Sequence, residues 1–374
     1  MKNVVLGFFL MLVFGLGCPT GGSAATLEEM VGQMLMIGFR GTSFDVESPL
    51  GEALKQGNLG GVILYDVDVA RGGVPRNIRS VEQVRALTSA LQEHAARPLL
   101  IAVDEEGGNV SRLAPRLGLE KTDSAAALGR KDAPALTRRA GRRIGRQLRH
   151  VGINWDFAPV VDLNRNPSSP AIGKLDRSFG PTTKKVTRHA AAFIHGLHDV
   201  GVLSCIKHFP GHGSATADSH LGVTDITDTW SATELEPYAR LVGRELPDAV
   251  MTGHVFHAGL DPEAPATLSN TIIPELLRDA MGFEGVVVSD DLQMGAIREA
   301  YTLQETVRRC LHADVDILLF GNNLEYEPYI WRRVQTIISE LVREGHVSRA
   351  RIERSYERIQ KLKTRLGVFT GTEP

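Results

Sequence analysis

The densest set of ionisable side chains in the sequence lies between residues 207 and 220. It contains Lys-His-Phe-Pro-Gly-His-Gly at 207–213 and Asp-Ser-His at 218–220. Asp218 and His220 are two positions apart, so in extended backbone their side chains lie on the same side. A carboxylate beside a histidine orients the ring and stabilises its protonated form, which lets the histidine deliver a proton near neutral pH. This pair is a candidate general acid/base.

Charged residues also end several apolar runs, namely Asp104, Asp162, Lys207 and Asp290. Carboxylates accept hydrogen bonds from pairs of hydroxyl groups, and lysine donates to the same oxygens, so this mixture suits a polyhydroxyl ligand. Hydrolysis of a glycosidic bond needs a nucleophile or base and, in addition, an acid. An aspartate held among cations stays ionised and can be the nucleophile. The residues alone leave several aspartates eligible.

Eight short apolar runs would position these side chains. They are rich in Val, Ile, Leu and Ala, as expected for parallel strands that are buried on both faces. Helical patterns lie between them, most clearly at 81–95 and 134–150. This alternation predicts a single-domain α/β fold over residues 26–374, a TIM (β/α)8 barrel with its site at the carboxyl ends of the strands. The predicted strands are residues 33–39, 61–65, 99–104, 153–162, 202–209, 249–256, 285–290 and 316–321.

Two helical segments are strongly charged. Residues 136–149 carry six arginines, which we interpret as a solvated helix face. Residues 348–366 form a second charged helical pattern, which Ser348 is placed to cap and which should pack on the outside of the barrel. Cys205 lies in an apolar run and is interpreted as a small core residue.

Composition restricts the partners. The 374 residues include 42 basic and 44 acidic side chains, a balance that argues against a nucleic-acid-binding protein. The hydrophobic content of 43% is typical of a packed protein. We expect a monomer with a carbohydrate as its partner.

The first 25 residues have the pattern of an export signal. Lys2 precedes an apolar run at 4–17, and small residues follow. Cleavage after the small residues at 23–25 would release a periplasmic or secreted protein. Alternatively, Gly-Leu-Gly-Cys at 15–18 is similar to a lipoprotein box, which would anchor the chain to a membrane through a lipid on Cys18.

The string at 207–220 resembles the signature of single-domain β-N-acetylglucosaminidases of glycoside hydrolase family 3. Gly-Val-Val-Val-Ser-Asp-Asp-Leu-Gln-Met at 285–294 resembles the nucleophile segment of that family. The resemblance extends from residue 27 to residue 367. It implies a retaining exo-β-N-acetylhexosaminidase that forms a covalent glycosyl-enzyme and uses neither metal nor cofactor. It also implies release of terminal non-reducing GlcNAc from peptidoglycan fragments or chitin-type oligosaccharides.

Carried over by position, the resemblance assigns the nucleophile to Asp290 and not to Asp291. It assigns the acid/base to His220, with Asp218 as its carboxylate partner. His212 would shape the loop, and Asn109 departs from the arginine that the family usually has there. The positions that correspond to contacts with GlcNAc are Asp104, Arg112, Arg177, Lys207 and His208.

Three other interpretations are open. A β-glucosidase or β-xylosidase of the same family would share the catalytic residues, and a glycan-binding barrel would need the sugar contacts without the catalytic groups. A metal-dependent hydrolase is suggested by the histidines, although residues 33–39 lack the His-x-His that barrel metallohydrolases commonly carry there. These histidines are His208, His212, His220, His254 and His257.

Overall fold

A computed structural model describes residues 25–219 and 222–369 of the chain. Residues 1–24, which hold Cys18 and nearly all of the predicted export signal, lie outside the described residues, and so does His220.

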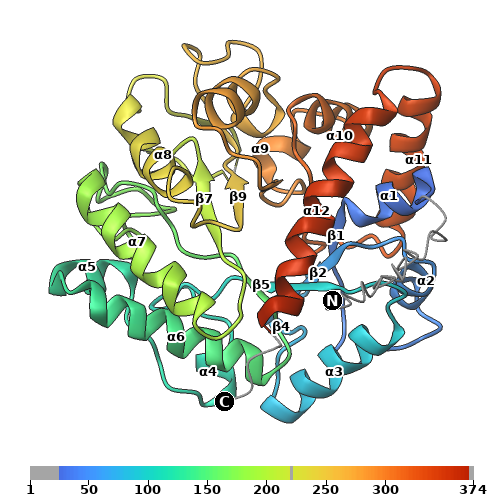
Figure 1. Cartoon of the computed structure of the whole chain (residues 1–374), viewed down its shortest axis with the longest axis horizontal. Coiled ribbons are helices and arrows are strands. Elements are labelled where there is room, and N and C mark those ends of the chain that lie inside the picture. The colour runs from blue at the N-terminus through green and yellow to red at the C-terminus, as the bar shows by residue number, and fades with distance from the viewer. Residues whose placement is uncertain (1–24, 220–221, 370–374) are drawn as a thin grey trace, which may run out of the picture.

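Eight strands form two parallel sheets at the centre of the molecule (Figure 1). The five-stranded sheet has the order β12-β1-β2-β5-β6, and the three-stranded sheet has the order β11-β9-β7. One strand falls within each of the eight predicted runs, which confirms the α/β alternation. The strands are β1 (Leu35–Gly38), β2 (Gly61–Ile63), β5 (Leu100–Val103), β6 (Trp155–Asp156), β7 (Cys205–Phe209), β9 (Ala249–Thr252), β11 (Val286–Val288) and β12 (Leu318–Phe320).

Isolated parallel bridges connect the two sheets at both of their ends. On one side, Trp155 pairs with Leu203 and Val160 pairs with Lys207, which joins the β6 segment to β7. On the other side, Val288 of β11 pairs with Ile317, the residue just before β12. The strands are therefore in register across both boundaries between the sheets.

Each predicted run is longer than the strand inside it, and three of these differences have a local cause. Residue Gln33 ends helix α1 (Leu27–Gln33), where its side-chain amide donates to two backbone carbonyls. The run at 153–162 yields only the two residues of β6, because Pro159 has no N–H to donate to a neighbouring strand. The run at 249–256 splits after β9, and its last two residues form β10 (Val255–Phe256), which pairs with β8 (Thr224–Asp225).

Helices surround the strands (Figure 1). No helix in the described ranges is both long and apolar enough to cross a membrane. A short antiparallel pair, β3 (Val67–Asp68) and β4 (Val74–Pro75), lies outside the parallel sheets. The remaining α-helices are α2 (Pro49–Lys55), α3 (Val81–His94), α4 (Ala114–Leu117), α5 (Ala125–Lys131), α6 (Pro134–His150), α7 (Thr183–His198), α8 (Glu236–Val242), α9 (Gly295–Arg298), α10 (Leu303–His312), α11 (Ile330–Arg343) and α12 (Arg349–Phe369). Short 3-10 helices span Val69–Arg71, Ala232–Leu235 and Ala266–Leu268, and a π-helix spans Ile272–Ala280.

The strands are buried on both faces, as their composition predicts. Every residue of β1, β5 and β7 is buried, and Cys205 is inaccessible to solvent, which confirms it as a core residue. Burial of this apolar surface is the main stabilising contribution to such a fold. Polar groups inside it must therefore be paired, which restricts where charged side chains can lie.

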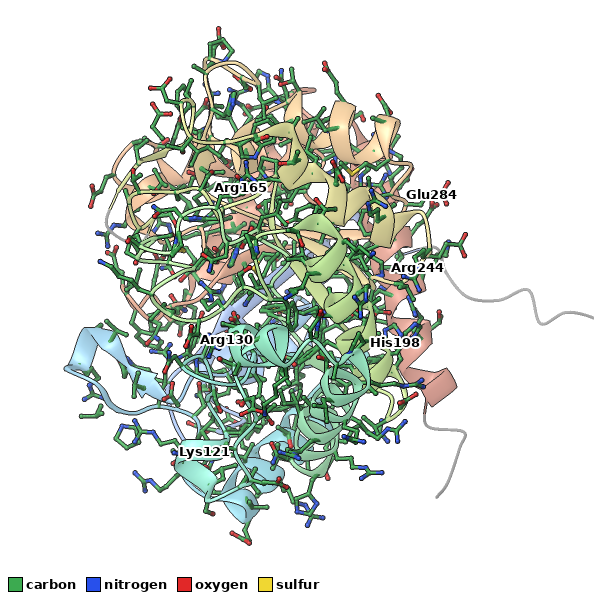
Figure 2. All side chains as sticks on the ribbon, turned by 90° about the vertical axis from the view of Figure 1, so that its left-hand side faces the viewer. Lys121, Arg130, Arg165, His198, Arg244 and Glu284 are labelled. Atoms are coloured by element: carbon green, nitrogen blue, oxygen red, sulfur yellow. The ribbon has the colours of Figure 1, made fainter. Side chains whose placement is uncertain are left out.

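The two charged helices lie as the sequence predicts. Helix α6 covers the same bounds as the predicted segment; it buries Ile144 and Leu148, and several of its arginines are exposed. Figure 2 views this side of the molecule, where Lys121 and Arg130 also reach the surface. Helix α12 packs against α1, and the Ser348 hydroxyl accepts a hydrogen bond from the Arg351 N–H at 3.2 Å, which confirms the predicted cap.

Candidate functional site

The predicted site residues lie at the carboxyl ends of the strands. Asp104 follows β5 directly, and Asp290 follows β11 after Ser289. Lys207 and His208 lie within β7 itself. Because the strands are parallel, these positions face the same end of the sheets, which is where α/β proteins assemble their ligand sites.

The Lys207 ammonium joins two acidic groups that come from the segment after β5. Its Nζ lies 2.7 Å from Asp104 Oδ1 and 2.7 Å from Glu106 Oε1. Glu106 also accepts two hydrogen bonds from the Arg177 guanidinium, at 2.9 and 2.7 Å. Lys207 and Glu106 are buried, whereas the Asp104 side chain is 21% exposed. Asp104 can therefore meet a ligand while the buried charges behind it hold its position.

The charges in this network stabilise one another. Burial by itself would raise the pKa of Glu106, but the cations of Arg177 and Lys207 outweigh it and bring that pKa well below the usual range. Burial would lower the pKa of Lys207, but Asp104 and Glu106 outweigh it, so that pKa is raised. Both groups are ionised at neutral pH. Paired charges at this depth give fixed donors and acceptors, which suits recognition of hydroxyl and amide groups.

His208 connects the network to Asp162. Its Nδ1 lies 2.8 Å from Asp162 Oδ2, and its Nε2 lies 3.2 Å from the Arg177 guanidinium. Arginine only donates, so Nε2 must accept, and the proton of the neutral ring is therefore on Nδ1, where it is donated to Asp162. Asp162 also accepts the backbone N–H of His208 at 3.2 Å. These contacts fix the orientation of the His208 ring.

Asp290 is partly exposed and lies within electrostatic range of Tyr65, which follows β2. Its Oδ1 accepts the N–H of Asp291 at 2.8 Å. Burial raises the pKa of the Tyr65 phenol, and the carboxylates of Asp291, Asp104 and Asp290 add to that shift. Asp104 and Asp290 are therefore both within electrostatic range of the Tyr65 phenol.

The neighbouring Asp291 has a different environment. Its Oδ1 accepts the N–H of Gln293 at 3.0 Å and the N–H of Gly321 at 2.8 Å, and its side chain is buried. These contacts connect the segment after β11 to the segment after β12. Asp291 is therefore arranged to hold backbone, whereas Asp290 is partly exposed.

The segment that carries Asp218 begins immediately after β7. The N–H of His212 donates to Asp162 Oδ1 at 2.8 Å, and the N–H of Gly213 donates to Glu234 Oε2 at 3.1 Å. Farther along, the Ser219 carbonyl accepts the N–H of Ala296 at 3.2 Å. Helix α9, which contains Ala296, begins five residues after Asp290. The part of this loop that the structure describes, up to Ser219, therefore reaches from β7 to helix α9.

Arg112 is the predicted contact that lies apart from this network. Its guanidinium lies 3.7 Å from Asp66, and its backbone N–H donates to Glu105 at 2.7 Å. Asn109 is on the same loop and is 3.3 Å from the Leu175 carbonyl, to which its amide donates. That contact joins the loop to the segment before Arg177. The residue type at position 109 therefore affects how the two loops meet.

Among the histidines that suggested a metal site, His208 and His212 have ring centroids 5.8 Å apart, whereas His254 has other partners. His254 contacts the Thr267 hydroxyl at 2.8 Å and the Asp291 carbonyl at 2.9 Å. Burial, followed by the nearby His208, lowers the pKa of His212 to about 4. Within residues 25–219 and 222–369, no group of three or more His, Cys, Asp or Glu side chains is arranged to hold a metal ion.

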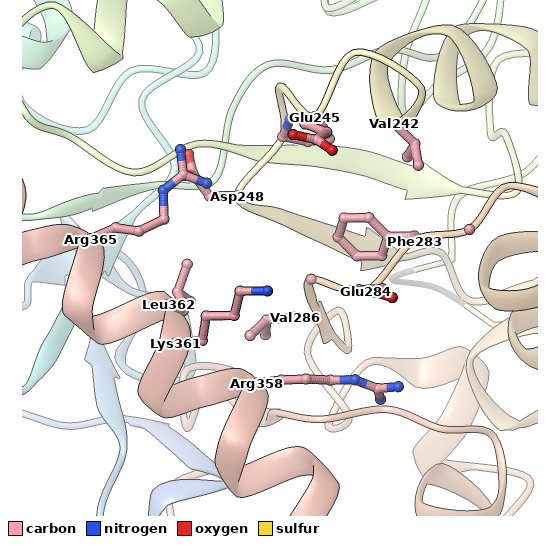
Figure 3. Close-up of a pocket in the computed structure, with 13 residues that line it drawn as sticks. Val242, Glu245, Asp248, Phe283, Glu284, Val286, Arg358, Lys361, Leu362 and Arg365 are labelled. Atoms are coloured by element: carbon pink, nitrogen blue, oxygen red, sulfur yellow. The ribbon is translucent and has the colours of Figure 1, made fainter.

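A cavity of about 600 Å³ lies at the other end of the sheets (Figure 3). It is lined by Asp248, directly before β9, and by Gly285, directly before β11, together with α12. There Arg365 pairs with Asp248 at 2.6 Å. The amino ends of the strands are the side that serves stability in such folds, so this cavity is separate from the site.

Sequence reasoning missed the role of Glu106. Its carboxylate contacts both Lys207 and Arg177. Its position two residues after Asp104 could have indicated that role, because alternate residues of an extended segment point to the same side. Nothing comparable could identify Glu234, which is distant in sequence from the loop it contacts.

Comparison with known proteins places the chain in a family. Residues 26–362 match the model of the glycosyl hydrolase family 3 N terminal domain. A protein of Alkalilimnicola ehrlichii named β-hexosaminidase is 38% identical over 80% of this chain and 84% of its own. β-Hexosaminidase A of Pseudoalteromonas piscicida is 31% identical over 91% of this chain.

A solved structure agrees with these matches. A glycoside hydrolase family 3 β-N-acetylglucosaminidase from Paenibacillus sp. is 35% identical and superposes over 94% of this chain with a TM-score of 0.84. The chain spans 64% of that protein and 61% of the Pseudoalteromonas enzyme. The match to the family model nevertheless covers nearly all of the described residues. The chain belongs to the family of the glycosyl hydrolase family 3 N terminal domain.

Proposed function

We propose that the protein is a retaining exo-β-N-acetylhexosaminidase that releases terminal GlcNAc from peptidoglycan fragments or chitin-type oligosaccharides. The observation that carries this proposal is the network in which Lys207 and Arg177 share Glu106, with Asp104 partly exposed in front of it. It supplies fixed cations and carboxylates for the hydroxyl groups of a sugar. The relatives named above are β-hexosaminidases and a β-N-acetylglucosaminidase.

In the proposed mechanism, an oxygen of Asp290 attacks the anomeric carbon while His220 gives a proton to the leaving oxygen. This breaks the glycosidic bond and forms a glycosyl ester on Asp290. His220 then takes a proton from water as the water oxygen attacks the same carbon, which frees Asp290 and completes retention. Asp218 supports the positive charge that His220 carries before the first step and regains in the second. The partial exposure of Asp290 and of Asp218 supports these roles.

We further propose that the two sheets form one closed TIM (β/α)8 barrel. The bridges from the β6 segment to β7, and from β11 to the residue before β12, support closure on both sides. A closed barrel brings all eight carboxyl ends into one ring. Asp104, Lys207 and Asp290 would then surround a single sugar ring, together with Arg177 and His208. Arg112, held near Asp66, would act from the edge of that ring.

The test is hydrolysis of a panel of β-aryl glycosides by the purified protein. We expect p-nitrophenyl β-N-acetylglucosaminide to have the highest kcat/KM, ahead of the GalNAc, glucose and xylose analogues. The anomer released first should be β, as retention requires. Preference for glucose or xylose would contradict the assignment of the sugar. No turnover by the folded protein would leave only a glycan-binding function.

We also propose that the protein is exported and is either free or lipid-anchored through Cys18. The pattern of the first 25 residues supports export. Mass spectrometry of the mature protein from cells tests this proposal. A lipid-modified Cys18 would show anchoring, and a new N-terminus after residue 25 would show release. An unprocessed Met1 would contradict both.

A further inference from the structure

We propose that Glu234 is a positioning residue for the acid/base pair, because its carboxyl group holds the turn at 211–214 from which the chain continues to Asp218 and His220. The proposal rests on the proposed function. It assigns a role to a residue that lies outside the strands and outside the charged network described above.

The contact between Glu234 and the turn is direct. Glu234 lies in the 3-10 helix Ala232–Leu235, and 1% of its surface is exposed. Its Oε2 accepts the N–H of Gly213 at 3.1 Å. Four residues earlier, the Trp230 indole donates to the Pro210 carbonyl at 3.2 Å. The segment at 230–234 therefore holds the start of the loop at two places.

The turn fits closely against this carboxyl group. Gly211 has φ of +124°, and a Cβ at that position would lie 2.7 Å from Glu234 Cβ and 2.8 Å from Oε2. A Cβ at Gly213 would lie 1.7 Å from the Leu163 carbonyl oxygen on the other side. Glycine is thus required at both positions. Gly211 needs the positive φ that glycine tolerates, and neither Gly211 nor Gly213 has room for a Cβ. The turn is held between the Glu234 side chain and the segment after β6.

Two carboxylates hold consecutive amides of this turn. Asp162 accepts the N–H of His212 at 2.8 Å, and Glu234 accepts the N–H of Gly213. Asp162 also orients the His208 ring, so one side of the turn is tied to the sugar-binding network. Glu234 ties the other side to the 3-10 helix. The loop is held again at Ser219, beside α9, so a shift at its start must be absorbed in the few residues that carry Asp218.

A carboxyl group is costly at this position. Burial raises the pKa of Glu234 to about 7. Asp162 raises it further, whereas the hydrogen bond from the Gly213 N–H and the nearby Arg165 lower it. The buried Tyr238 hydroxyl of α8 also lies within electrostatic reach. An apolar side chain would avoid the cost of desolvating a carboxyl group. The hydrogen bond to Gly213 is the contribution that such a side chain could not make.

The first part of the test compares substrates with different leaving groups. General acid catalysis matters most when the leaving group needs a proton, so His220→Ala should slow N,N′-diacetylchitobiose far more than the p-nitrophenyl glycoside. We expect Glu234→Ala to show the same asymmetry, with kcat for the disaccharide about 10–100-fold lower. Glu234→Gln should restore most of that rate, because its carbonyl oxygen can still accept the Gly213 N–H. Equal slowing of both substrates would overturn the proposal.

The matched control is Glu236→Ala. Glu236 is two residues away on α8, and its exposed side chain pairs with Arg240 at 3.3 Å. We expect both substrates to be hydrolysed at the wild-type rate. A leaving-group effect in this variant as large as that of Glu234→Ala would show that the site responds to any change in this segment, and would overturn the specific role of Glu234.

The second part of the test does not depend on turnover. Amide hydrogen exchange of the peptide that covers residues 210–219 should be faster in Glu234→Ala and unchanged in Glu234→Gln, with thermal unfolding used to show that both variants are folded. If the wild type hydrolyses no N-acetylglucosaminide, the proposed function fails, yet exchange still reports whether Glu234 holds the turn. Unchanged exchange in Glu234→Ala would overturn the proposal even in an active enzyme.

Discussion

At the scale of single residues, the site depends on charges that are buried together. Glu106, Lys207 and Arg177 are each buried or nearly so, and each stabilises the ionised form of another. A buried charge without its partner is expensive, so each member holds the others in one arrangement. The residues that we propose to meet a substrate, Asp104 and Asp290, are instead partly exposed.

Glu106→Gln tests this dependence. Removing the negative charge of Glu106 leaves the buried positive charges of Lys207 and Arg177 less well neutralised. We therefore expect the free energy of unfolding to fall by about 3–5 kcal/mol. Urea unfolding measures this change. The control is Glu120→Gln, whose partner Arg143 is also exposed; it should change stability by less than about 1 kcal/mol. Similar losses in the free energy of unfolding for the two variants would contradict a central role for Glu106.

Asp290→Ala tests the nucleophile. Loss of the attacking oxygen should lower kcat for the aryl N-acetylglucosaminide by at least about 10³-fold, without a change in the melting temperature. Asp279→Ala serves as the control, because Asp279 is exposed in the π-helix and should keep full activity. If Asp291→Ala abolished turnover in a folded protein and Asp290→Ala did not, the assignment between the two neighbours would be wrong.

At the scale of elements, the parallel strands bring together side chains that are distant in sequence. β5, β7 and β11 each place a polar residue at or beyond their carboxyl end, and the connecting helices bury the apolar faces. The last helix, α12, packs against α1 near the start of the described chain. Its docking joins the two ends of the fold, so its start should matter to the stability of the whole.

Ser348→Ala tests that start. The Ser348 hydroxyl accepts the Arg351 N–H, and loss of an N-cap of this type costs about 1 kcal/mol. We expect the midpoint of denaturant unfolding to fall accordingly, with no change in kcat. Ser348→Asp keeps a side-chain acceptor and should retain the wild-type midpoint. Equal losses in both variants would show that the hydroxyl does not act as a cap.

At the scale of the whole molecule, one buried lysine connects α12 to the amino ends of the strands. Lys363 Nζ donates to Gln33 Oε1 at 2.7 Å and to the Pro98 carbonyl at 2.6 Å. Burial, with a smaller contribution from Arg97, lowers the pKa of Lys363 to about 7. The neutral amine still has two N–H groups for these two acceptors.

This pKa predicts a pH dependence of stability. Between pH 7 and the ordinary lysine pKa near 10.5, the unfolded chain binds the proton more tightly than the folded one. The contribution of Lys363 to stability is therefore complete above that range and is lost as pH falls towards 7, by up to about 1.4 kcal/mol per pH unit. Unfolding of Lys363→Met from pH 7 to 9 should lack this slope. Lys361→Met, on the exposed side of α12, should keep it.

The local patterns of the sequence predicted which helices and strands form better than they predicted where each one begins and ends. Helix 134–150 was correct at both ends, because Pro134 begins it and the amphipathic period continues to its end. The run at 153–162 was too long, because its apolar composition does not show where hydrogen bonding to a neighbouring strand stops. Strand bounds depend on such pairing, which is not local.

What the sequence determined by itself was the α/β alternation, the polar residues that end its strands, and the family to which its motifs belong. These depend on local periodicity and on short strings of residues. The tertiary structure decided which charges meet. Glu106 rather than Asp104 proved to be the shared partner of Lys207 and Arg177, and Glu234 contacts a turn about 20 residues away. Such pairings depend on packing between separate elements, so no local pattern records them. For His220 and Cys18, which lie outside the described residues, the assignments stay predictions.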